Sequence, residues 1–208
     1  MSLVKYKAKR NFKATPEPGA GKAAPTKKLS FVVQRHKASR LHYDFRLEME
    51  GVLKSWAVPK GPSLNPGDKR LAMMVEDHPY NYKDFTGTIP EGNYGAGIVE
   101  IWDKGSYTAL KEDKKASDEK LLLKGLKEGS LKFVLNGKKL KGEFALVKLK
   151  NNRAGDNAWL LIKHRDKYST DDVYDSEEET PENSPINKWL SANKTVKKKP
   201  ISKRLPQK

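Results

Sequence analysis

Apolar and polar residues alternate along most of the chain between residues 29 and 163. Successive side chains on a strand point to opposite faces, so a period of two predicts a β-strand with one buried face. Turn-forming glycine, proline, asparagine and aspartate residues separate the alternating segments. The predicted strands are residues 29–36, 41–49, 52–58, 70–78, 98–102, 106–110, 131–135, 142–149 and 159–163. Many short strands at regular spacing predict a mainly β fold, a compact closed or nearly closed β-barrel.

Three segments depart from this simple pattern. Residues 116–128 are predicted to form a short amphipathic helix, and a second short helix is predicted to dock through Ile186, Trp189 and Leu190. A strong hairpin signal, Asn136-Gly137, joins two alternating runs. The glycine-rich residues 84–97 lack the Gly-Lys-Ser/Thr ending of a phosphate-binding loop and precede a predicted strand, so we interpret them as a barrel-corner loop.

The net charge of +16 is concentrated at the two ends of the chain. Residues 1–28 carry eight Lys/Arg and one Glu, and residues 186–208 carry eight Lys/Arg and no acidic residue. An acidic run, residues 171–182, precedes that lysine-rich tail. The predicted organisation is an irregular basic N-terminal arm over 1–28, a barrel domain over 29–170, and then the acidic run and the tail. Basic arms of this kind bind polyanions such as nucleic acids through their phosphates.

The chain contains no cysteine, which excludes disulfides, zinc ribbons and thiol catalysis. No stretch has the run of about 18 apolar residues that a transmembrane helix needs. The N-terminus also lacks the apolar core of a signal peptide. We therefore predict a cytoplasmic protein that is not bound to a membrane.

The polar face of residues 31–48 is the most informative feature of the sequence. By strand alternation, His42, Asp44 and Arg46 share one face, and Gln34 and His36 occupy the matching face of the preceding strand. A single histidine on a strand is more often structural than a ligand. Two of only four histidines, six positions apart and beside an in-phase aspartate, instead favour a divalent metal site. Ligand chemistry alone leaves Mn²⁺, Fe²⁺, Zn²⁺ and Co²⁺ open.

Cationic and hydrogen-bonding residues accompany this predicted metal site. Arg46 and His78 can lie on the same inner face of the predicted barrel. Cleavage of a phosphate ester needs a metal together with donors for the non-bridging oxygens. The donors that the chain offers are Arg46, Lys60, Arg70, His78 and Tyr82. The residues thus point to phosphoester chemistry, with His78 and Tyr82 both able to serve as the general acid.

Several consecutive stretches resemble one known family. They are residues 31–48, 52–62, 71–82, 89–97 and 157–166. Together they resemble the 3′-phosphoesterase domain of bacterial and archaeal DNA ligase D. The resemblance extends over roughly residues 5–168. Because the remaining length could not hold a ligase or polymerase domain, we expect a free-standing form of this domain.

This resemblance implies a monomeric β-barrel enzyme that depends on Mn²⁺, with Co²⁺ or Zn²⁺ as substitutes. Its substrates would be DNA 3′ ends, on primer-templates terminated by a ribonucleotide or a phosphate. It would leave a 3′-OH for a separate ATP-dependent DNA ligase and a polymerase in end joining. The implied metal ligands are His36, His42 and Asp44, and the implied catalytic residues are Arg46, His78 and Tyr82. The implied substrate- and phosphate-binding residues are Arg10, Glu17, Gln34, Lys60 and Arg70.

The N-terminal arm departs from the family pattern at one position. Asn11 stands where the family typically has an aspartate, so the arm carries an uncharged amide there.

Two other functions remain open from the sequence. A facial triad of His42, Asp44 and His78 would suit an Fe(II)/2-oxoglutarate oxygenase, although the basic arms and Arg46 would then have no role. A non-catalytic module that binds DNA ends for a repair ligase would explain the charge but leave the histidine–aspartate cluster unexplained.

Overall fold

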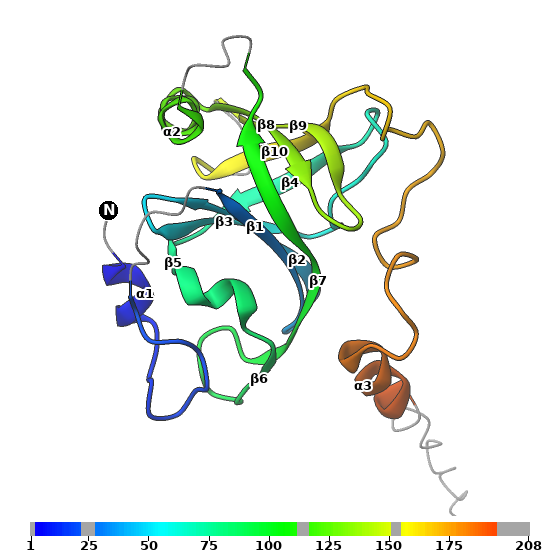
Figure 1. The fold of residues 1–208 in the computed structure, drawn as a ribbon. Helices are drawn as coiled ribbons and strands as arrows, with labels where there is room; N and C mark the ends of the chain where they lie inside the picture. Colours follow the sequence, from blue (N-terminus) through cyan, green and yellow to red (C-terminus); the bar gives the residue numbers. More distant parts are fainter. Residues whose placement is uncertain (1–2, 22–27, 112–116, 151–154, 195–208) are drawn as a thin grey trace, which may run out of the picture.

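A closed β-barrel forms the body of the protein (Figure 1). The computed structural model describes residues 3–21, 28–111, 117–150 and 155–194. Within these residues, eight strands follow one another around the barrel, and the last pairs with the first. In order they are β1 (Ser30–Lys37), β2 (Leu41–Met49), β3 (Val52–Val58), β4 (Lys69–Met74), β10 (Ala158–Lys163), β9 (Lys141–Lys148), β8 (Ser130–Asn136) and β7 (Gly97–Ala109). The predicted mainly β, closed-barrel fold is confirmed.

In the part of the chain that the structure describes, two short strands and four helices lie outside the eight strands of the barrel. Strand β5 (His78–Pro79) pairs with β3, and β6 (Gly87–Ile89) pairs with β7. The helices are α1 (Val4–Ala8), a 3₁₀ helix η1 (Tyr80–Asp84), α2 (Asp118–Glu128) and α3 (Pro185–Lys194). No helix within the described residues is long and apolar enough to cross a bilayer. The lysine-rich end of the predicted tail, residues 195–208, lies outside the described part of the chain.

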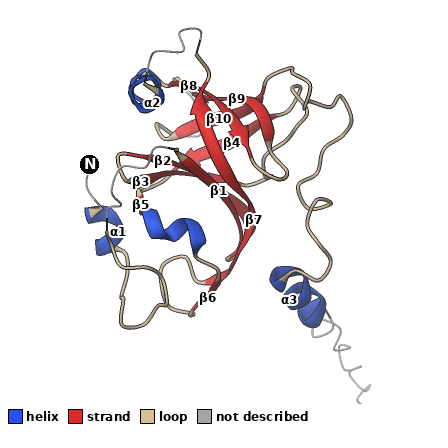
Figure 2. Ribbon diagram, viewed as in Figure 1, coloured by secondary structure: helices blue, strands red, loops and turns tan. Residues whose placement is uncertain are grey.

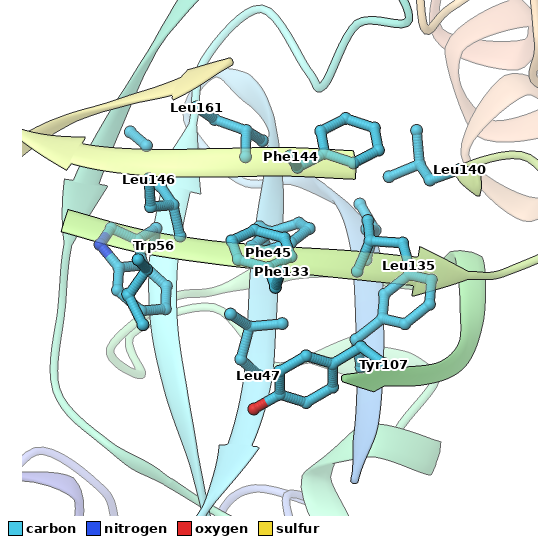
Figure 3. Close-up of a cluster of buried hydrophobic side chains, with 14 of the residues drawn as sticks. Phe45, Leu47, Trp56, Tyr107, Phe133, Leu135, Leu140, Phe144, Leu146 and Leu161 are labelled. Atoms are coloured by element: carbon cyan, nitrogen blue, oxygen red, sulfur yellow. The ribbon is translucent and has the colours of Figure 1, made fainter. Parts of the chain in front are cut away.

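The barrel interior is filled by apolar side chains from alternate positions of the strands (Figure 3). The Phe133 ring lies 5.9 Å from that of Phe45 and 6.3 Å from that of Phe144, measured between centroids. Full burial of one such side chain contributes about 1.5–3 kcal/mol. On β2, Tyr43, Phe45 and Leu47 all belong to this core. The alternation predicted for this strand is therefore correct.

A second apolar cluster lies on the opposite face of β1–β3. It joins α1 and η1 to the barrel and contains Leu3, Tyr6, Val52, Leu53, Tyr82, Phe85, Ile89 and Val99. Figure 2 shows η1 on the side of β1–β3 that faces away from β8–β10. The polar row of β2 points to this side, because its odd positions fill the barrel core. Arg46 and His78 do share one face, as expected, but it is the outer face of the barrel and not the inner one.

Several predicted boundaries also need correction. The strand predicted over residues 70–78 ends at Met74, and only His78 and Pro79 pair again, as β5. The strands predicted over 98–102 and 106–110 are one continuous strand, β7. The predicted hairpin of β8 and β9 exists, with a loop longer than two residues. In that loop the Asp103 carboxylate accepts hydrogen bonds from the N–H groups of three consecutive residues, Lys138, Lys139 and Leu140.

The acidic run after β10 packs along the barrel wall. Ser176 is fully buried, and the Trp102 indole N–H donates to the Ser176 carbonyl (3.1 Å) and the Thr180 hydroxyl (3.0 Å). Helix α3 follows and buries Ile186, while Trp189 remains 41% exposed. The sequence predicted a docked helix here. It did not predict that buried polar groups of the preceding segment attach this part of the chain to the barrel.

Candidate metal centre and active site

Two histidines and an aspartate meet where β1 and β2 pair. His36 lies directly opposite His42 in the antiparallel register, and their rings are 4.8 Å apart. Asp44 follows on the same face of β2, with one carboxylate oxygen 3.5 Å from His36 Nδ1 and the other 3.8 Å from His42 Nε2. One potential ligand atom from each residue lies within 4.8 Å of the other two. The three predicted metal ligands are thus brought together.

Backbone carbonyls hold both imidazoles in the tautomer that a metal requires. His36 Nε2 lies 2.9 Å from the Gly95 carbonyl, and His42 Nδ1 lies 3.0 Å from the Arg40 carbonyl. A carbonyl only accepts hydrogen bonds, so these outer nitrogens carry the protons. A metal ion would then bind the inner nitrogens, which face Asp44. Such outer hydrogen bonds are the usual support of metal-binding histidines.

The spacing of the donor atoms fits a single ion. Ligands at the corners of a tetrahedron, with bonds of about 2.0–2.2 Å, lie about 3.4 Å apart. The Asp44 oxygens lie 3.5 and 3.8 Å from the two imidazole nitrogens, close to this spacing, and all three ligand atoms lie within 4.8 Å of one another. Two imidazoles and one carboxylate also leave coordination positions for substrate and water. The donor set of His36, His42 and Asp44 therefore fits a catalytic divalent metal.

Arg46 keeps the Asp44 carboxylate ionised. Burial alone would raise the pKa of Asp44, but the Arg46 guanidinium, followed by His36 and His42, holds that pKa well below its ordinary value. Arg46 Nη2 lies 3.1 Å from Asp44. A permanently ionised aspartate is available as a ligand across the neutral pH range.

The Arg46 side chain is itself fixed on all three nitrogens. Its Nε donates to the Gln34 side-chain oxygen (2.7 Å), and Nη1 donates to the Ser55 hydroxyl (2.9 Å). Gln34 is fully buried and donates in turn to the carbonyls of Tyr82 and Phe85. Gln34 thus links Arg46 to η1. Because these contacts prevent rotation, the guanidinium is preorganised beside the metal donors.

The N-terminal arm completes the opposite wall of the site. Arg10 Nε donates to Glu17 (2.9 Å), and the same Glu17 oxygen accepts a hydrogen bond from the Tyr82 hydroxyl (2.8 Å). Thr15 donates to the other Glu17 oxygen. Asn11 stays exposed, and its side-chain oxygen accepts only a local bond from the Lys13 N–H among the contacts described. Arg10 and Glu17 therefore lie at the site, although more than 60 residues separate them from Tyr82 in the sequence.

His78 is held as a neutral imidazole. Its Nδ1–H donates to the Glu76 carbonyl (2.9 Å), and its Nε2 lies 3.2 Å from Arg10 Nη2, which can only donate. Burial, followed by Arg46 and Arg10, lowers the pKa of His78 well below its ordinary value. The metal-type cluster found among the described residues contains His36, His42 and Asp44 and not His78. This arrangement does not match the facial triad of an oxygenase.

Tyr82 remains protonated. Burial raises the pKa of Tyr82 well above its ordinary value; Arg46 opposes that rise and Glu17 adds to it. The Arg46 guanidinium lies 4.9 Å from the centre of the Tyr82 ring. At neutral pH the Tyr82 hydroxyl carries a proton that it donates to Glu17, whereas the proton of neutral His78 is on Nδ1 and is donated to the Glu76 carbonyl.

These groups line a cavity of about 290 Å³. Besides Arg10, His36, His42, Asp44, Arg46, His78 and Tyr82, its walls include Ala38, Ala57, Val75, Glu76, Ile89, Tyr94 and Gly95. Gln34 and Glu17 lie immediately behind this wall. Lys60 and Arg70 instead line a separate cavity of about 450 Å³, together with Tyr43 and residues of the acidic run. There Arg70 donates to Asp68 and to the Tyr174 carbonyl.

Four residues of the site were not predicted from the sequence. Ser55 orients Arg46, and Gly95 orients His36. Glu76 accepts bonds from Lys9 (2.9 Å) and Arg10 (3.2 Å) and so fixes the arm, while Tyr94 lies at the cavity wall and also contacts Lys9. Strand parity could have suggested Ser55, which lies opposite Arg46 in the β2–β3 pairing. The others depend on loop geometry.

Comparison with known proteins agrees with this geometry. A family model described as the DNA Ligase D 3′-phosphoesterase domain matches residues 34–148. The chain is 49% identical over 166 residues to the multifunctional non-homologous end joining protein LigD of Pseudomonas aeruginosa, covering 79% of the chain and 19% of that protein. It is 41% identical over 166 residues to the LigD of Mycolicibacterium smegmatis, covering 79% and 21% respectively. It is 40% identical over 170 residues to that of Mycobacterium tuberculosis, covering 81% and 20%. The chain thus spans about a fifth of the length of these relatives.

Proposed function

The chain belongs to the DNA ligase D 3′-phosphoesterase domain family, and from that premise we propose that it is a Mn²⁺-dependent enzyme that trims DNA 3′ ends. It removes a terminal ribonucleotide or a terminal 3′-phosphate and leaves a 3′-OH. The observation that carries this proposal is the His36–His42–Asp44 donor set with Arg46 fixed beside it in one cavity. The partners proposed are a separate ATP-dependent ligase and a polymerase, in line with the end-joining names of the relatives.

Each side chain of the site has a separate role in the proposed reaction. A divalent ion held by His36, His42 and Asp44 would supply Lewis-acid polarisation of the phosphoryl oxygens and a more acidic water. Arg46 would offer its remaining N–H groups to the non-bridging oxygens as negative charge develops. Arg10, held by Glu17, Glu76 and His78, adds a second cation from the arm. The Tyr82 hydroxyl, protonated at neutral pH and hydrogen-bonded to Glu17, is the proton donor we propose for the leaving oxygen.

The test is a metal series on primer-templates that end in a ribonucleotide or a 3′-phosphate. We expect no turnover in excess chelator and recovery with Mn²⁺, with Co²⁺ or Zn²⁺ as weaker substitutes. Product analysis should show a 3′-OH end. Full activity in excess chelator would contradict the metal assignment. Binding of the DNA ends without any turnover in Mn²⁺ would instead favour the non-catalytic end-binding module.

A second prediction separates phosphate chemistry from metal binding. Arg46→Lys keeps a cation beside Asp44 but loses the planar fork, so turnover should fall by about 10²–10³-fold while Mn²⁺ affinity changes little. His78→Ala should also lose turnover and keep the metal, because His78 orients Arg10 and lies outside the donor cluster. The measurements are single-turnover kinetics and calorimetric Mn²⁺ titration.

The matched control is His164→Ala, which removes a partly exposed histidine paired with Glu143 and away from the cavity. It should leave both turnover and metal affinity unchanged. If Mn²⁺ affinity in the His78 variant fell in step with turnover, His78 would have to be a metal ligand and the assigned donor set would be wrong.

A further inference from the structure

One exposed aromatic residue stands at the edge of the active-site cavity. Tyr94 is 49% exposed, and every other residue lining that cavity is buried or only partly exposed. The reaction proposed above, however, uses only the buried groups of the cavity and gives Tyr94 no role.

The loop that carries Tyr94 is anchored to the metal site. The next residue, Gly95, accepts the His36 N–H at 2.9 Å and has a backbone φ of +76°, a left-handed conformation that glycine adopts without strain. The pairing of Ile98 with Lys37 holds the other end of the loop against β1, and the backbones pack so closely there that a Cβ on Gly97 would lie 2.1 Å from the Lys37 carbonyl. The position of the Tyr94 ring is thus tied to the position of a metal ligand.

Two cations of the N-terminal arm flank the ring. Lys9 Nζ lies 4.4 Å from the ring centre and 3.1 Å from the Tyr94 hydroxyl, and the Arg10 guanidinium lies 5.6 Å from the ring centre. Glu76 holds both cations in place. An aromatic face next to fixed positive charges is the combination with which proteins hold single-stranded nucleic acid, since the bases stack and the phosphates are neutralised.

From this arrangement we propose that Tyr94 is the stacking platform for the nucleobase at the 3′ end of the substrate. The inference rests on the proposed function, in which the terminal phosphoester enters the cavity. A phosphoester bound beside Arg46 leaves its nucleoside at the cavity mouth, where Tyr94 presents the exposed ring. Every base has a π face, so stacking would hold the end in place whatever its sequence. Lys9 would neutralise the adjacent phosphate.

The test uses oligonucleotides whose 3′-terminal base is 2-aminopurine, mixed with the full-length protein in excess chelator so that no turnover occurs. Stacking on Tyr94 should quench the fluorescence on binding. Tyr94→Leu should abolish the quenching and weaken binding about tenfold or more, whereas Tyr94→Phe should behave like wild type. The matched control is Tyr168→Ala, since Tyr168 is 42% exposed and also lies beside a lysine but not in the cavity.

A substrate lacking the terminal base makes the test specific. If Tyr94 contacts that base, removing the base should weaken DNA binding by the wild-type protein but should not weaken binding by Tyr94→Leu any further. The proposal would be overturned if removing the base and replacing Tyr94 each reduced the affinity by the same factor whether or not the other change was present. Fluorescence quenching that survives in Tyr94→Leu would also overturn it. An unchanged Mn²⁺ affinity in Tyr94→Leu would show that His36 has not moved. The binding measurement needs no catalysis, so the two proposals can fail separately. Base stacking on Tyr94 without any hydrolysis would refute the proposed function alone. Hydrolysis without coupling between Tyr94 and the terminal base would refute the stacking role of Tyr94 alone.

Discussion

Replacing Asp44 by asparagine is expected to abolish phosphoesterase turnover and to weaken Mn²⁺ binding by at least about 100-fold. The substitution conserves size, so the loss comes from the charge. Asparagine provides a weaker ligand and removes the one negative charge among two imidazoles and the Arg46 guanidinium. The fold should persist, because Gln34 and Ser55 continue to hold Arg46 and the new amide oxygen can still accept from it. Calorimetric Mn²⁺ titration, turnover assays and circular dichroism measure the three effects.

The matched control is Asp166→Asn. Asp166 is also a largely buried aspartate in an ion pair, with Lys163 at 2.6 Å, but it lies away from the metal cavity. This variant should lose stability and keep both turnover and Mn²⁺ affinity. Chelator-sensitive turnover that survives in Asp44→Asn would show that Asp44 is not a ligand. A collapse of the fold in that variant alone would mean that Asp44 acts mainly by neutralising Arg46.

The metal donors were predictable because they depend on local geometry alone. His36, His42 and Asp44 lie on two adjacent strands joined by a short turn, so strand parity decides which side chains converge. The same parity placed Gln34 and Arg46 beside them. These groups touch in the structure as the pattern indicates, and the alternation of Tyr43, Phe45 and Leu47 into the core follows from the same rule.

In the outer wall of the site, Arg10 and Glu17 were predictable only through the family resemblance, and the Lys9–Glu76 contact was not predicted at all. Glu17 meets Tyr82 across 65 positions, and Lys9 meets Glu76 across 67. No periodicity within a strand carries information about such contacts, because they depend on how α1 and η1 pack on the second apolar cluster. The position of Tyr94 at the site could not be predicted for a similar reason. Its loop was interpreted as a barrel corner, and its position at the cavity depends on the Gly95–His36 bond.

Arg70 shows how an error in the predicted end of a strand changes the predicted direction of a side chain. A continuous strand over residues 70–78 would align Arg70 with His78 on one face. Strand β4 ends at Met74, and the chain reaches His78 through an irregular segment. Arg70 instead lies with Lys60 in the other cavity, where the acidic run covers it. Residue type and the family resemblance both suggested phosphate binding for Lys60 and Arg70, and that role remains a prediction.

The acidic run shows the limit of composition as a guide. A cluster of acidic residues beside a basic tail suggests a solvated segment. In the structure, however, this acidic run binds to the barrel through Arg35. Arg35 alternates with Gln34 and His36 and is fully buried on the far side of β1. Its guanidinium donates to Glu100 (2.8 Å), Glu177 (2.9 Å from Nε) and Asn187 (2.8 Å). Glu177 also accepts a hydrogen bond from Tyr43.

Arg35→Met should therefore destabilise the fold strongly. Methionine fills much of the volume but leaves the Glu100 carboxylate, 6% exposed, without its cation. Removing one partner of a buried ion pair costs about 3–5 kcal/mol. The segment containing Glu177 and α3 loses its main polar attachment at the same time. Urea unfolding of the variant and of wild type measures the difference in free energy of unfolding.

The control for this prediction is Arg165→Met, which breaks a largely exposed pair with Asp171 and should leave the stability almost unchanged. Activity per folded molecule should survive in Arg35→Met, because Arg35 points away from the face that holds His36. A change in free energy below about 1 kcal/mol would show that the acidic run contributes nothing to the fold. Loss of Mn²⁺ affinity in a folded Arg35 variant would instead mean that the packing of this run on β1 positions His36, and the metal site would then depend on a segment at the opposite face of the sheet.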